Sequence, residues 1–167
     1  GTFTWADGRT YTGDFVRNRR HGHGVYTWPD TGACYAGAFM DNQRCGQGSY
    51  RDPGQCIDYT GSWKDGVYHG YGTYHWTDHT HHPIYSAAAA TGAAGSSNIG
   101  KQYVYAGNFR QGLPDGMGKE ILKSDGTVRH FGLWKAGKPV LEEHNTAYVV
   151  NDTMDGHVVE IDSDSHS

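Results

Sequence analysis

The 167-residue sequence has little of what builds a conventional layered core. Only 36% of its residues are hydrophobic. No apolar run approaches the length of about 18 residues that a membrane-spanning helix needs, so we expect no membrane span. The hydrophobic content is low for two packed layers, which argues against an aliphatic core.

Cysteine is scarce as well. Cys34, Cys45 and Cys56 are odd in number and form no C-x-x-C pair. This usage favours free thiols in a reducing compartment, and hence a cytoplasmic protein. A disulfide pair or a metal site is the less favoured alternative.

Signatures of catalysis are missing too. The sequence contains no G-x-S-x-G, no H-E-x-x-H and no phosphate-binding loop that ends in Lys-Ser/Thr. The net charge of -4 comes without a basic stripe, which disfavours nucleic acid as a partner. We therefore expect neither an enzyme nor a bound cofactor.

Glycine and aromatic residues are abundant and regularly placed. In residues 59–76, YTGSWKDGVYHGYGTYHW, rings and glycines recur two residues apart on both sides of a polar segment headed by Asp65-Gly66. A spacing of two puts alternate side chains on one face of a β-strand. The stretch therefore predicts a β-hairpin with one aromatic face, and KDGVYHG as its turn.

Copies of this hairpin fill most of the chain. The first-strand pattern Tyr-x-Gly-x-Phe/Trp occurs at Tyr11–Phe15, Tyr35–Phe39, Tyr59–Trp63 and Tyr105–Phe109, and a weaker copy has His130, Gly132 and Trp134. The second-strand pattern Gly-x-Gly follows at Gly22/Gly24, Gly46/Gly48, Gly70/Gly72 and Gly116/Gly118. A fixed phase of this kind indicates an array of supersecondary units.

The pattern resembles the MORN (membrane occupation and recognition nexus) repeat family, with HGHGVYTWPD at 21–30 and HGYGTYHW at 69–76 as the nearest matches. The resemblance implies an all-β fold, an elongated single-layer antiparallel sheet of tandem β-hairpins. The glycines have a packing role in such a sheet: we expect Gly13 and Gly24 to leave slots that a ring from a neighbouring strand covers. Pairs of rings across strands would then form the core.

Two domains follow from this pattern. The array occupies residues 1–139 in about five units, the first of which is partial, because Gly1, Phe3 and Trp5 align with Gly24, Tyr26 and Trp28. We expect further repeats upstream of Gly1. Residues 140–167, acidic and without Lys or Arg, are expected to form a last hairpin that covers the sheet edge, followed by an acidic tail.

The array is interrupted between residues 77 and 102. SAAAATGAAGSSNIG has no pattern of rings and glycines, so we expect a long loop inserted into a hairpin, with a degenerate repeat as the alternative. His75, His79, His81 and His82 have metal-binding side chains, yet they lack a second ligand group at a set spacing, so a polar loop is preferred and no metal is expected. Two interpretations fit the Arg17, Arg19 and Arg20 cluster: a contact with an anionic head group or an acidic partner, and a solvated hairpin tip, which is favoured.

Exposed rings on one side of a single sheet mark a surface for a partner segment, such as an amphipathic helix. We expect the following rings to form both the core and the partner site: Tyr11, Phe15, Tyr26, Trp28, Tyr35, Phe39, Tyr50, Tyr59, Trp63, Tyr74, Trp76, Tyr105 and Phe109. The open sheet edges also allow a homo-oligomer.

The family resemblance implies a non-catalytic scaffold in a cytoskeletal assembly, such as a ciliary axoneme or radial spoke. One alternative is a phospholipid-associated tethering module, for which the basic stretch 119–138 is the strongest support. Another is the regulatory domain of a larger enzyme.

Overall fold

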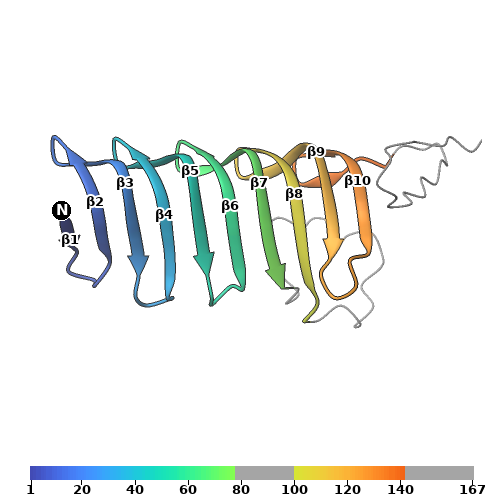
Figure 1. The fold of residues 1–167 in the computed structure, drawn as a ribbon, viewed down its shortest axis with the longest axis horizontal. Coiled ribbons are helices and arrows are strands. Elements are labelled where there is room, and N and C mark those ends of the chain that lie inside the picture. The colour runs from blue at the N-terminus through green and yellow to red at the C-terminus, as the bar shows by residue number, and fades with distance from the viewer. Residues whose placement is uncertain (78–99, 142–167) are drawn as a thin grey trace, which may run out of the picture.

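The computed structural model describes residues 1–77 and 100–141. All of the regular structure in these ranges is β-strand (Figure 1). The strands are β1 (Thr2–Thr4), β2 (Thr10–Val16), β3 (Arg19–Trp28), β4 (Ala33–Met40), β5 (Gln43–Asp52), β6 (Ile57–Lys64), β7 (Val67–Thr77), β8 (Gln102–Arg110), β9 (Leu113–Leu122), β10 (Val128–Lys135) and β11 (Lys138–Pro139).

One antiparallel sheet contains all eleven strands in the order of the chain, β1 to β11. Each strand pairs only with its predecessor and its successor, and Figure 1 shows the hairpins side by side in a single row. The predicted fold class is therefore confirmed. No second layer of described residues covers the sheet. Each hairpin is therefore stabilised by the hairpins before and after it in the row.

Two-residue turns close the hairpins at one side of the sheet. Their residues have positive φ: Arg17-Asn18, Asp41-Asn42, Asp65-Gly66, Gln111-Gly112 and Ala136-Gly137. A turn with two positive φ values matches the twist of the flanking strands. The predicted turn KDGVYHG was too long, because β7 begins directly after Gly66 and contains Val67 to Gly70.

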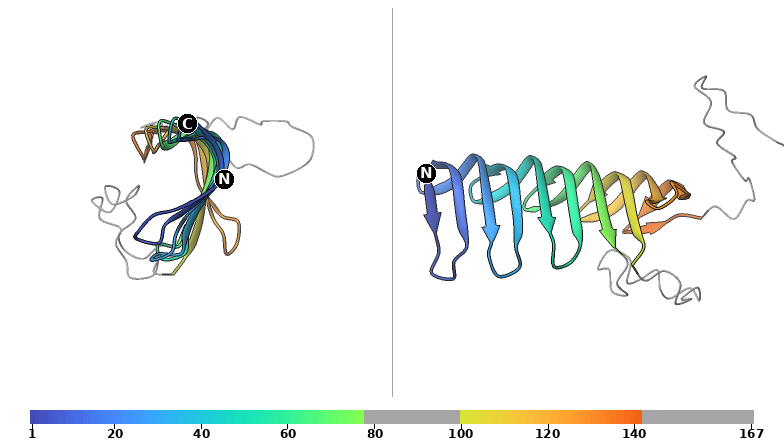
Figure 2. Two further views of the ribbon diagram at one scale, coloured as in Figure 1. Left: turned by 90° about the vertical axis from the view of Figure 1, so that its left-hand side faces the viewer. Right: turned by 60° about the horizontal axis from the view of Figure 1, so that its bottom comes forward.

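Each of the four complete hairpins bends at a β-bulge. In the first complete hairpin Gly13 pairs with Gly24, and Phe15 pairs with Arg20, so three residues of β3 lie opposite Asp14 alone. Gly22 lies in this bulge with a φ of 73°, a value that glycine adopts without strain. Gly46, Gly70 and Gly116 repeat that geometry. The hairpins bend in the same direction, and seen end-on the strands nearly superpose in one curved profile (Figure 2).

The second glycine of each pair makes room for a tyrosine. A Cβ atom at Gly24 would collide with the ring of Tyr11, which comes from the neighbouring strand, as the sequence predicted. The expectation for Gly13 was only partly right: a Cβ there would meet the backbone of β3 at Gly24 as well as the Tyr11 hydroxyl. Both paired strands therefore need a glycine at the position that lies beneath the tyrosine ring.

The tyrosine hydroxyl crosses the glycine pair and donates a hydrogen bond to a carbonyl at the bulge. Tyr11 donates to Asp14 O at 2.9 Å, Tyr35 to Ala38 O at 2.9 Å, Tyr59 to Ser62 O at 2.8 Å and Tyr105 to Asn108 O at 3.0 Å. In the weaker fifth copy of the first-strand pattern, His130 Nε2 lies 3.3 Å from Leu133 O, so the histidine takes the place of the tyrosine.

Successive hairpins are also joined at their turns. The second turn residue of one hairpin donates its backbone N–H to the preceding hairpin: Asn42 to Arg20 O, Gly66 to Arg44 O, Gly112 to Tyr68 O and Gly137 to Pro114 O, at 2.8 to 3.0 Å. These bonds fix the stagger between units, in addition to the strand ladders.

The sheet is continuous across the interruption in the sequence. β7 pairs with β8 from Gly70↔Phe109 to Thr77↔Gln102, so no repeat is inserted between these strands. The insertion follows β7 and precedes β8, and therefore lies in the connection between two repeat hairpins, not inside one as expected. Residues 78–99 and their histidines, and the predicted capping hairpin and tail at 142–167, lie outside the described residues.

The N-terminal strand fits its predicted place as the second half of a unit. Phe3 of β1 pairs with Tyr11, as Tyr26 of β3 pairs with Tyr35. At the other end, β11 closes with Pro139 opposite Trp134, and Val140 N–H donates to Leu133 O. None of the described residues forms a helix that could cross a membrane. All three cysteines are free thiols.

Candidate partner-binding face

The aromatic rings of the repeat pattern lie on one face, and that face is concave. Tyr35 and Phe39 are four residues apart on β4, a separation of about 13 Å along a flat strand. Their ring centroids are nevertheless only 5.1 Å apart. The bend at the bulge therefore turns the two halves of the hairpin toward each other. We call this side of the sheet the concave face.

The rings of the concave face form a continuous ladder. Each first-strand tyrosine makes an edge-to-face contact with the Phe or Trp of its own unit and another with that of the next unit. The contacts to the next unit are Tyr11–Phe39, Tyr35–Trp63, Tyr59–Phe109 and Tyr105–Trp134, with centroids 5.0 to 5.3 Å apart. Edge-to-face pairs of this kind contribute about 0.5–1.5 kcal/mol each beyond their buried area.

Most of the rings predicted to form the partner site are buried in the core of this ladder. Buried members are Tyr11, Tyr26, Tyr35, Phe39, Tyr59, Trp63, Tyr74, Trp76, Tyr105 and Phe109. Tyr35, for example, is 0% exposed. Trp28 and Tyr50 are half-buried, and Phe15, near the N-terminal edge, is 38% exposed. The ring surface that remains accessible thus belongs to a minority of the predicted residues.

The same face has a second column of side chains that the sequence analysis did not predict. Arg20, Arg44, Tyr68 and Pro114 occupy equivalent positions, each paired with the Phe or Trp of its hairpin. The first three recur with the same 24-residue period as the glycines. The interpretation of the arginine cluster as a solvated tip was therefore wrong for Arg20, which lies over rings, while Arg17 and Arg19 are exposed.

Arg20 lies among rings from β2, β3 and β4 and the ring of Trp5, which follows β1. Its guanidinium carbon is 5.0 Å from the Tyr26 ring centroid, 5.4 Å from that of Phe39 and 5.7 Å from that of Trp5. Its Nη2 donates to Asn42 O at 2.8 Å. A cation over an aromatic face is attracted by the ring quadrupole, by about 0.5–1 kcal/mol at exposed sites and more when desolvated.

Arg44 repeats this arrangement one unit further along. Its guanidinium carbon lies 4.4 Å from the Trp63 ring centroid, and Nη2 donates to Gly66 O at 2.7 Å. Burial lowers the pKa of Arg44, and the positive charge of Arg20 acts in the same direction. An arginine remains charged at neutral pH despite such a shift, so Arg20 and Arg44 place two positive charges on the concave face.

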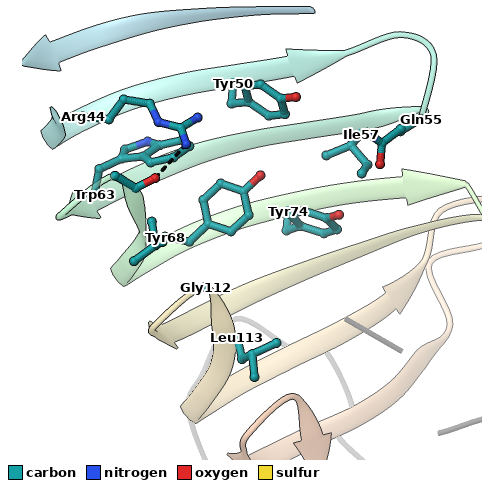
Figure 3. Close-up of a pocket in the computed structure, with 11 residues that line it drawn as sticks. Arg44, Tyr50, Gln55, Ile57, Trp63, Tyr68, Tyr74, Gly112 and Leu113 are labelled. Atoms are coloured by element: carbon teal, nitrogen blue, oxygen red, sulfur yellow. Dashed lines mark hydrogen bonds between the residues drawn. The ribbon is translucent and has the colours of Figure 1, made fainter. Parts of the chain in front are cut away.

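A pocket of about 390 Å³ extends from Arg44 toward Leu113. Figure 3 shows the side chains of Tyr50, Tyr68 and Tyr74 between these two residues. Tyr68 stacks on Tyr59 with centroids 4.0 Å apart, which leaves its other surface to the pocket. The lining is aromatic and aliphatic apart from Gln55, the hydroxyls and the guanidinium, a composition typical of a binding site.

Tyrosine hydroxyls near the pocket are neutral at physiological pH. Burial raises the pKa of Tyr50 to about 12, and the hydrogen bond from its hydroxyl to Asp52 acts in the same direction. Burial also raises the pKa values of Tyr68 and Tyr74. Asp52 is only 3% exposed and accepts bonds from Gln55 N at 3.1 Å and Nε2 at 2.9 Å, so its carboxylate closes the turn between β5 and β6.

The concave face becomes less aromatic in its last units, as the sequence predicted. Glu120 occupies the place of Tyr26 and Tyr74, and it forms an ion pair with Arg129 at 3.8 Å. Burial raises the pKa of Glu120, and Arg129 opposes that shift. Arg129 also donates to the Tyr103 hydroxyl at 3.1 Å. A charged pair thus fills the space that rings fill elsewhere in the ladder.

In the described part of the chain, no group of three or more His, Cys, Asp or Glu residues is arranged to hold a metal ion. The arrangement on the concave face can bind, through rings, hydroxyls and two guanidinium groups.

Comparison with known proteins agrees with the repeat pattern. The family model of the MORN repeat matches residues 11–32, 35–57, 59–81 and 105–127, together more than half of the sequence. No curated protein matches the chain. MORN repeat proteins are generally non-catalytic repeat modules, and their repeats mediate contacts with proteins or membranes. Four matched repeats and a single sheet of tandem hairpins show that the chain belongs to the MORN repeat family.

Proposed function

We propose that this protein is a non-catalytic scaffold that binds a segment of a partner protein on its concave face. The observation that supports this proposal is the pocket beside Arg44, where Tyr50, Tyr68 and Leu113 present apolar surface. A soluble protein rarely leaves hollowed aromatic surface without a partner. Buried rings behind the pocket hold it in place, so binding would need little rearrangement.

We further propose a cytoplasmic location in a cytoskeletal assembly, with a ciliary axoneme or radial spoke as the setting. This part rests on the family resemblance alone. Imaging of the tagged protein in ciliated cells tests it: enrichment along the axoneme is expected, and a uniform cytoplasmic distribution would contradict it.

A pair of matched variants tests the binding face. Leu113→Arg places a long cation in the pocket, whereas Leu133→Arg makes the same change at an exposed residue adjacent to Trp134, on the opposite face. Affinity capture from extracts of ciliated cells, quantified by mass spectrometry, is expected to recover a partner with the unmodified protein and with Leu133→Arg. Leu113→Arg is expected to lose it. Equal recovery with both variants would refute binding on the concave face.

A further inference from the structure

Two arginines of the concave face have no carboxylate partner among the described residues. Five other arginines of the described residues do form ion pairs, with nitrogen–oxygen distances of 2.8 to 3.8 Å. The pairs are Arg9 with Asp7, Arg19 with Asp41, Arg51 with Asp58, Arg110 with Asp115 and Arg129 with Glu120. Arg20 and Arg44 contact rings and one backbone carbonyl each instead.

These contacts leave both guanidinium groups with hydrogen-bonding capacity to spare. An arginine has five N–H donors in a planar fork that fits a carboxylate with two parallel bonds. Nη2 of Arg44 is engaged with Gly66 O, and Trp63 covers one face of the fork. A carboxylate that approaches from the open side would meet a charge that is already ordered, so little side-chain entropy would be lost on binding.

The distance between the two charges selects the shape of the ligand. Arg20 lies on β3 and Arg44 on β5, two strand spacings apart, which is about 10 Å. On an α-helix, residues seven positions apart share a face and are separated by about 10.5 Å along the axis. On an extended strand, residues three positions apart cover a similar distance but point to opposite sides.

Beyond Arg44 the same column turns apolar. Tyr68 follows, then Pro114, with the pocket toward Leu113 beside them. The column from β3 to β9 spans six strand spacings, about 29 Å, which corresponds to about 19 residues of helix. One end of this path is cationic and the other is aromatic.

We propose that the concave face binds a helical segment of a partner protein with two acidic side chains seven residues apart, which pair with Arg20 and Arg44, followed by apolar side chains that fill the pocket. This inference rests on the proposed function, and it adds the charge, the spacing and the polarity of the partner.

Selection from a peptide library tests the proposal and does not require an identified partner. The probe is a phage-displayed library of peptides of about 20 residues, the length of the path, that includes helix-forming and proline-rich backbones. The full chain is the bait. We expect enrichment of helix-forming peptides with Asp or Glu at positions i and i+7 and with Leu, Phe or Met on one side of that pair.

Charge variants then assign the contacts. Replacing either acid of a selected peptide by its amide, or Arg20 or Arg44 by Gln, is expected to weaken binding about tenfold, equivalent to about 1.4 kcal/mol. Arg51→Gln is the matched control, because Arg51 pairs with Asp58, lies next to Tyr50 on the strand and faces away from the rings. Arg44→Lys, which keeps the charge and loses the fork, is expected to bind with intermediate affinity and guards against a folding defect.

The alternatives give distinct results. Selected peptides that lack the acid pair, that carry it on proline-rich backbones, or that bind Arg20→Gln unchanged would overturn the inference, as would a selection that enriches nothing. If such peptides still lose binding to Leu113→Arg, the proposed function stands and only the charge pattern fails.

Two further probes identify other occupants. Arginine-dependent binding to phosphatidylserine vesicles, with no peptide selected, would assign the charges to lipid headgroups. A synthetic peptide of residues 142–167, with seven acidic side chains and no Lys or Arg, is tested in the same assay. Binding that depends on Arg44 would identify the chain's own C-terminal segment as the occupant and overturn the assignment to a partner protein.

Discussion

The close fit of Tyr35 over Gly48 makes the substitution Gly48→Ala unusually costly. A Cβ atom at Gly48 would overlap the Tyr35 ring, which cannot retreat because Phe39 and Trp63 contact it edge-on. Overpacking costs about 1–3 kcal/mol, and the displaced hydroxyl would lose its bond to Ala38 O, worth about 1 kcal/mol. We expect the free energy of unfolding to fall by about 2–4 kcal/mol.

Gly66→Ala is the control within the same part of the sheet. Gly66 has a φ of 82°, and a Cβ there would meet no atom within 4 Å. Only the left-handed backbone is penalised, by about 1–2 kcal/mol. Urea unfolding, followed by tryptophan fluorescence and by circular dichroism, measures both variants.

A double-mutant cycle isolates the contact itself. In a Tyr35→Leu background the ring is absent, so Gly48→Ala is expected to cost at least about 1 kcal/mol less than in the unmodified protein. If Gly48→Ala costs no more than Gly66→Ala, or if the cycle shows no coupling, the packing of the ring over bare backbone does not stabilise the fold as argued.

Three further outcomes are expected. Tyr59→Phe removes a buried hydrogen bond and lowers the free energy of unfolding by about 1 kcal/mol, while Tyr71→Phe, at a side chain that is 63% exposed, leaves it unchanged; equal effects in urea unfolding would contradict this. Burial raises the pKa of Tyr35 from 10.0 to about 12, so the unfolded chain releases this proton first and stability falls as pH rises from 10 toward 12. Tyrosinate absorbance should therefore rise together with the loss of circular dichroism, and full ionisation of the folded protein near pH 10 would refute the shift. Burial also raises the pKa of the Cys45 thiol, so iodoacetamide should label the exposed Cys56 faster than Cys45. Mass spectrometry measures both labelling rates, and equal rates would contradict this expectation.

The hairpins could be predicted from sequence because their signal is local. Rings and glycines alternate with a period of two, and the pattern recurs in phase in successive units. The face on which each side chain lies and the pairing within each hairpin both follow from that periodicity. The single sheet followed from the family resemblance, and the fading of the aromatic pattern predicted the unequal ends of the array.

The arginine column could have been found by the same rule. Counting back by two from Trp28 passes Tyr26, Gly24 and Gly22 and arrives at Arg20. The predicted strand was instead taken to begin at the glycine pair. The bulge leaves three residues of β3 opposite one of β2, so the alternation of faces is preserved across it.

The periodicity of the sequence could not predict which rings are buried in the core and which remain accessible. It depends on the bend at the bulge, which brings Phe39 of one unit onto Tyr11 of the unit before it, 28 residues earlier in the chain. Spacing along one strand predicts the face on which a side chain lies. It does not predict how strongly that face curves, and hence which rings come into contact. For the same reason the pocket beside Arg44 had no sequence signal.

The pairing of every strand with its chain neighbours alone also determines how the array would respond to force. The hydrogen bonds of an antiparallel ladder lie perpendicular to the strands, and hence along the row of hairpins. Tension applied at the two ends therefore opens the ladders one after another instead of shearing many bonds at once. The outermost ladders would yield first, since β1 pairs through three residues and β11 through two. Stretching should thus peel the sheet from its ends in small steps, and the central hairpins would be the last to lose their shape.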